Sequence, residues 1–122
     1  MEMMVGLDVY NQQNAVSNDP YVLILKLYEG LLRYLSFAEE AMENGDVEEK
    51  FIYINKSIAI FDELRNVLDF DGGDIAHYLD GLYLYQIETL FTAGINDNVN
   101  LIHQVKKVSQ GLIEAWKDET GL

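Results

Sequence analysis

Hydrophobic side chains recur three and four positions apart along most of the chain, which is the period of an α-helix. Two runs show this most clearly: Phe51, Ile54, Ile58, Phe61, Leu64 and Leu68, and then Leu101, Val105, Val108, Leu112 and Trp116. No segment alternates apolar and polar residues as a half-buried strand does. The pattern therefore predicts an all-α protein.

Residues typical of helix ends divide the chain into four helical segments. Asp19-Pro20 predicts the first start, because Asp accepts hydrogen bonds from free amides and Pro fits the first helical position. At Gly45-Asp46, the glycine predicts the end of one helix and the aspartate predicts the cap of the next. Further breaks are predicted at 71–74 and at 94–97, where Gly94 is the predicted helix stop. The short links favour an antiparallel up-down bundle of four main helices over residues 19–122, preceded by an N-terminal cap arm over residues 1–18.

The first and third segments are apolar on more than one face. The first carries the stripe Ile24, Leu27, Tyr28, Leu31, Leu35 and Ala38, with further apolar residues beside it. Between Ile75 and Gly94 the only charged side chains are Asp80 and Glu88. These helices are either central ones that touch two neighbours and the arm, or part of their surface is a groove for a partner. Both interpretations hold if the arm covers the groove until a partner displaces it.

Charge and composition narrow the class of protein. The formal net charge of -13 over 122 residues argues against nucleic acid and anionic membrane as partners, because binding to phosphates depends on clustered Lys and Arg. The absence of Cys excludes disulfides and thiolate catalysis. No stretch reaches the ~18 apolar residues of a membrane span, and the segment 1–8 lacks the basic start of a secretory signal. We therefore expect a cytoplasmic protein without membrane insertion.

Candidate catalytic and metal-binding motifs are incomplete. His77 follows Asp74 by three positions and His103 follows Asn100 by three, whereas a di-iron bundle requires Glu-x-x-His on two helices. Gly72-Gly73 is not followed by the Lys and Ser or Thr of a phosphate-binding loop. We expect no catalytic residues, no metal and no cofactor.

An ordered set of short motifs covers residues 8 to 118. It comprises Tyr10-Asn11-Gln12-Gln13-Asn14-Ala15-Val16, Asp19-Pro20, Leu27-Tyr28-Glu29-Gly30, Asn44-Gly45-Asp46, the stretch from Leu64 to Asp69, Gly72-Gly73-Asp74-Ile75-Ala76, Leu82-Tyr83, Asn96-Asp97, and Leu112 with Trp116. This set resembles the bacterial flagellin chaperones, also called flagellar secretion chaperones. Two positions depart from the family pattern: Asp19, where the family often has Ser, and Val9, where it often has a small residue.

The resemblance implies a helical bundle with an N-terminal cap segment, in which Tyr10 and Val16 are the cap residues. It implies a cytoplasmic export chaperone that binds the C-terminal region of flagellin, prevents its premature polymerisation and delivers it to the flagellar export apparatus. The export gate and a co-chaperone or antagonist would be further partners. Together with the apolar stripes, the resemblance predicts a flagellin-binding groove lined by Ile24, Leu27, Tyr28, Leu31, Leu64, Leu68, Leu79, Leu82 and Tyr83.

Two other functions stay open at this point. A small metal-binding helical-bundle enzyme would use the His and carboxylate side chains. A homo-oligomerisation module would bury the same apolar faces between identical chains. For the chaperone we expect a monomer or a dimer that exchanges its arms.

Overall fold

The structure, a computed structural model, describes residues 19–122, so the expected cap residues Tyr10 and Val16 and the rest of the arm lie outside the described residues. The described chain folds into α2 (Pro20–Glu43), α3 (Val47–Asn66), the short 3-10 helix η1 (Phe70–Gly72), α4 (Asp74–Asn96) and α5 (Val99–Thr120). Within this range no residue lies in a strand. The predicted all-α fold is confirmed.

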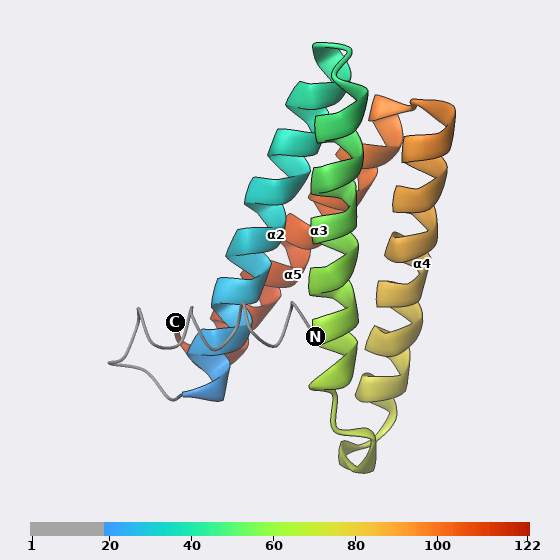
Figure 1. The fold of residues 1–122 in the computed structure, drawn as a ribbon. Helices are drawn as coiled ribbons and strands as arrows, with labels where there is room; N and C mark the ends of the chain where they lie inside the picture. The colour runs from blue at the N-terminus through green and yellow to red at the C-terminus, as the bar shows by residue number, and fades with distance from the viewer. Residues whose placement is uncertain (1–18) are drawn as a thin grey trace.

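The four long helices run alternately up and down (Figure 1). Each helix packs against two others, in the order α2, α3, α4, α5 and back to α2. Figure 1 shows α5 running obliquely behind the other helices, from the upper end of α4 to the lower end of α2. As a result the beginning of α4 and the end of α5 lie apart at the lower end of the bundle.

Capping residues begin two of the helices where the sequence predicts. The Asp19 side chain accepts a hydrogen bond from the Tyr21 amide at 2.9 Å, and Pro20 is the first residue of α2. Asp46 accepts from the Glu49 amide at 3.1 Å at the start of α3. These bonds satisfy amides that the first turn of a helix leaves without an intrahelical partner.

The predicted helix stop at Gly94 is wrong. α4 continues to Asn96, and Asp97 ends it in the left-handed conformation with φ of 51°. Gly94 instead allows α3 and α4 to approach closely, because a Cβ atom at this position would lie 2.9 Å from Cε1 of Phe51. Close packing of two helices therefore explains this glycine better than helix termination does.

The core lies between the helices and receives side chains from all four. Its largest fully buried side chains are Phe61, Leu31, Leu35, Ile54, Leu64, Leu90, Ile102 and Val105. Burying apolar surface contributes about 25 cal/mol per Å², so these residues dominate the stability of the bundle.

Candidate docking cleft

A cleft of about 730 Å³ opens where the first turns of α2 and α4 face the last turns of α5. Its lining residues are Tyr21, Tyr28, Ile75, Leu79, Leu112, Ala115, Trp116, Glu119 and Thr120. Apolar and aromatic side chains make up most of this lining, and Glu119 is its only side chain that carries a charge at neutral pH. We name this site the docking cleft.

The α5 wall of the docking cleft is attached to α2. The indole Nε1 of Trp116 donates a hydrogen bond to the backbone carbonyl of Tyr21 at 2.9 Å, and the two rings lie 5.6 Å apart. Because the indole N–H is already bonded, the ring acts as an apolar surface toward the cleft. This contact holds the last turns of α5 against the first turn of α2.

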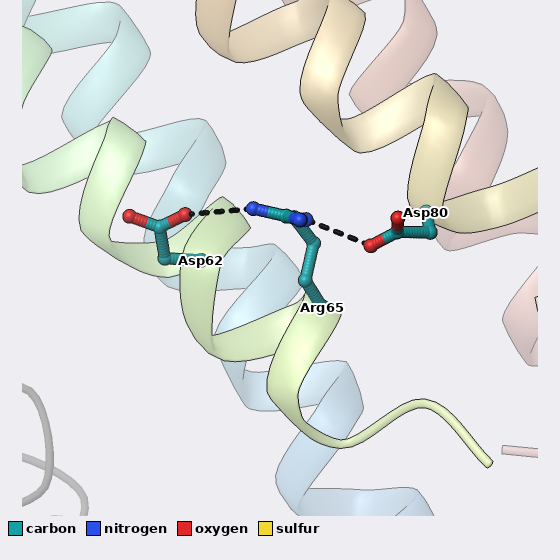
Figure 2. A network of polar contacts seen from close by, with 3 residues as sticks. All are labelled: Asp62, Arg65 and Asp80. Atoms are coloured by element: carbon teal, nitrogen blue, oxygen red, sulfur yellow. Dashed lines mark hydrogen bonds and ion pairs between the residues drawn. The ribbon is translucent and has the colours of Figure 1, made fainter. Parts of the chain in front are cut away.

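The α4 wall is attached to α3 (Figure 2). Nε of Arg65 on α3 donates to Oδ1 of Asp80 on α4 at 2.7 Å, while its other end lies 3.5 Å from Oδ1 of Asp62. Asp80 directly follows Leu79, a lining residue, so the bond fixes α4 beside the cleft. The α5 wall is therefore bonded to α2, and the α4 wall is bonded to α3.

Two buried tyrosines lie beneath the cleft. The hydroxyls of Tyr28 and Tyr83 are hydrogen-bonded to one another at 2.6 Å, and Tyr28 also lines the cleft. Burial raises the pKa of the Tyr28 hydroxyl far above its ordinary value, with smaller contributions from the charge and hydrogen bond of Tyr83. Burial likewise raises the pKa of Tyr83. Both phenols stay neutral at physiological pH, so the floor of the cleft is suited to an apolar occupant.

The docking cleft exposes more apolar surface than an isolated bundle requires. Ile75 is 62% exposed and Tyr21 is 55% exposed. Exposed apolar patches of this kind mark protein interaction sites. Helices commonly bind to such grooves by inserting apolar side chains.

The structure distributes the nine predicted groove residues over three environments. Tyr28 and Leu79 line the docking cleft. The residues Leu27, Leu31, Leu64 and Tyr83 are buried in the core without lining the cleft, and the residues Ile24, Leu68 and Leu82 are half-buried outside the lining. Contact of these side chains with a ligand stays a prediction.

The sequence analysis did not assign Tyr21, Leu112 or Trp116 to the groove, although all three line it. A signal was present in the two α5 residues, since both lie on its apolar stripe and in the family motifs. That stripe is narrow, and in a helix with one apolar stripe each member is expected to face the core. Only the oblique course of α5 places its final part at an opening.

One group of possible metal ligands lies at the opposite end of the bundle. Among the described residues, the donor atoms of Glu39, Glu43 and His103 lie within 4.8 Å of one another. Nε2 of His103 is 2.8 Å from Oε2 of Glu39, and the Lys106 ammonium is 3.6 Å from Oε1 of the same carboxylate. Glu39 thus already has a cationic partner, and the arrangement links α2 to α5 as a polar contact.

Within residues 19–122, no helix combines the length and hydrophobicity needed to cross a bilayer.

A helical bundle with an open apolar cleft is the architecture that suits the binding of a protein segment in a groove. The sequence profile of the family described as "Flagellar protein FliS" matches residues 3–120, so the chain belongs to this family. The predicted resemblance is confirmed.

Curated relatives support the same assignment, and a solved structure supports the fold. The chain is 40% identical to the "Flagellar secretion chaperone FliS" of Campylobacter jejuni over 97% of its own length and 93% of the relative's. It is 36% identical to the protein of the same name from Salmonella typhimurium, over 92% and 87% of the two chains. A solved structure described as "Crystal structure of flagellar chaperone from bacteria" matches with a TM-score of 0.79 at 23% identity, covering 97% of each chain. That match supports the fold.

Proposed function

We propose that this protein is a cytoplasmic export chaperone that binds the C-terminal region of flagellin in the docking cleft. In this role it prevents premature polymerisation of flagellin and delivers it to the flagellar export apparatus. The observation that carries the proposal is the apolar cleft of about 730 Å³ in a member of the FliS family. The curated relatives named flagellar secretion chaperones give further support.

The geometry of the cleft suits a flexible, partly apolar segment. Such a segment loses conformational entropy when it becomes ordered, and burial of apolar area offsets that loss. Each Å² buried contributes roughly 25 cal/mol before the costs of association. Because the Trp116–Tyr21 and Arg65–Asp80 contacts hold the two walls in place, the walls themselves need little reorganisation to bind.

We further propose that the arm over residues 1–18 covers the cleft until flagellin displaces it. The position of the first described helix supports this idea. α2 begins at Pro20, and Tyr21 lines the cleft, so the arm joins the bundle at the edge of the site. The arm also contains apolar residues suited to the lining, namely Met3, Met4, Val5, Leu7, Val9 and Tyr10.

Calorimetric titration of the full chain with a peptide of the cognate flagellin C-terminal region tests the proposal. We expect micromolar or tighter binding with a negative heat-capacity change, since apolar area is buried. The variant Ile75→Ser is expected to weaken binding by ~10-fold or more, because it places a polar group in the cleft. Val47→Ser is the matched control, since Val47 is similarly exposed, at 60% against 62%, and lies outside the cleft. Absence of binding at several temperatures, or equal loss in both variants, would contradict the proposal.

A further inference from the structure

The edge of the docking cleft is acidic. Glu119 on α5 is the only lining residue with a full charge, and it forms no ion pair with any described residue. No Lys or Arg lines the cleft. An occupant therefore meets an apolar surface that carries one carboxylate and no cationic side chain.

The arm of the chain has the same sign of charge as this edge. Residues 1–18 contain Glu2 and Asp8 and no Lys or Arg. Like charges brought together repel, and the repulsion grows where an occupant excludes water. The apolar residues of the arm match the cleft, whereas its side-chain charges do not.

We infer that Glu119 is a specificity-determining residue, which selects a docking segment carrying Lys or Arg beside its apolar anchor. This inference rests on the proposed function and names the chemistry of the segment that the cleft accepts. The apolar lining supplies most of the affinity, whereas the carboxylate distinguishes one apolar segment from another. A cationic flagellin segment thereby gains an advantage over the acidic arm of the chaperone.

The overall negative charge of the protein and a specific contact with Glu119 can both favour a cationic peptide, so the test distinguishes them. The net charge of -13 attracts any cationic peptide over a long range, without a defined site. Glu114 provides the matched control, because it is exposed on the same helix and does not line the cleft. Neutralising either residue changes the net charge equally, but only Glu119 belongs to the lining of the cleft.

The test uses the full chain and a series of peptides from the C-terminal region of the cognate flagellin. In each peptide one position beside a large apolar residue carries either Lys or Glu. Binding is measured by calorimetry and by the fluorescence of Trp116, the only Trp, which lines the cleft. At one position or more we expect the Lys peptide to bind ~5-fold more tightly than the Glu peptide.

The variants decide whether Glu119 is responsible for this preference. We expect Glu119→Gln to reduce the preference to below ~2-fold and Glu119→Lys to reverse it, whereas Glu114→Gln and Glu114→Lys retain it. If the Glu114 variants lose the preference for the Lys peptide to the same extent, the preference comes from the net charge and the inference is overturned. Tight binding with no preference at any position would overturn the inference and leave the proposed function intact. If no peptide binds, both are overturned.

Discussion

The two ends of the helical bundle differ in how the helices are connected. At the upper end in Figure 1, the Lys50 ammonium lies 3.3 Å from Oδ1 of Asp97, and His103 contacts Glu39, so polar contacts link α3 to the end of α4 and α2 to α5. At the lower end the same two helix pairs are bonded, α3 to α4 through Arg65–Asp80 and α2 to α5 through Trp116–Tyr21. The difference lies between α4 and α5: the short link of Asp97 and Asn98 joins them at the upper end, whereas no polar contact between described residues joins them at the lower end. There the side chains Ile75 and Trp116 face the docking cleft instead.

The comparison shows that polar contacts do not decide closure of this bundle, because they join the same helix pairs at both ends. The short link between α4 and α5 and the close packing at the upper end account for the difference. Gly94 brings α3 and α4 close at the upper end, where a side chain would meet Phe51. Ion pairs near the surface are worth at most about 1 kcal/mol each, so they align helices more than they stabilise them. At the lower end α4 and α5 have no such link, and the docking cleft lies between them and the first turns of α2.

The largest expected effect is the difference in the free energy of unfolding between a substitution in the core and one in the docking cleft. Leu31 is 0% exposed, so Leu31→Ala is expected to lower the free energy of unfolding by about 2–5 kcal/mol through loss of burial and formation of a cavity. Ile75→Ala in the cleft is expected to cost less than about 1 kcal/mol. Urea denaturation of both variants measures this. An equal loss in Ile75→Ala would mean that the α4 wall packs against α5 in solution.

A smaller effect is expected at the close contact between α3 and α4. Gly94→Ala adds a Cβ atom beside Phe51, and we expect a loss of about 1–2 kcal/mol from overpacking, reduced by the better helix propensity of Ala. Gly81→Ala on the same helix meets nothing within 4 Å and is expected to increase stability by about 0.5–1 kcal/mol. Thermal and urea unfolding compare the two. If both substitutions stabilise the protein, the two helices are not in tight contact at Gly94.

Removing the bond between α3 and the α4 wall of the cleft is expected to lower the free energy of unfolding by about 1 kcal/mol. Arg65→Met eliminates the 2.7 Å contact with Asp80 and retains most of the side-chain volume. The control is Arg33→Met, since Arg33 is exposed and forms no ion pair with a described residue. Chemical denaturation gives the stability, and Trp116 fluorescence reports on the cleft. Identical results for both variants would show that the Arg65 contact does not hold α4.

The smallest expected effect is a loss of stability at alkaline pH. Burial raises the pKa of Tyr28 and Tyr83 in the folded protein, whereas unfolded tyrosines ionise near their ordinary value of about 10. Their contribution is therefore fully present well below pH 10 and is lost as the pH rises toward the folded values, by about 0.4–0.8 kcal/mol at pH 10. Urea titrations at pH 8, 9 and 10 measure the change. The double variant Tyr28→Phe, Tyr83→Phe should lose this part of the pH dependence, and an unchanged slope would contradict the assignment.

The sequence by itself determined the helices and most of their ends. The three-and-four spacing of apolar residues, the Asp19-Pro20 start and the Asp46 cap act through bonds and contacts within a few residues. Such local interactions can be read without knowledge of the fold. The stop predicted at Gly94 failed because the reason for that glycine, close contact with Phe51, lies on another helix.

The docking cleft was decided by the tertiary structure. Apolar spacing identified Leu31 and Leu79 alike as groove residues, yet Leu31 is in the core and Leu79 lines the cleft. Trp116, on an ordinary stripe, became a wall of the cleft because its bond to the Tyr21 carbonyl draws α5 toward α2. Periodicity specifies which face of a helix is apolar, but the angle between helices determines whether that face is covered.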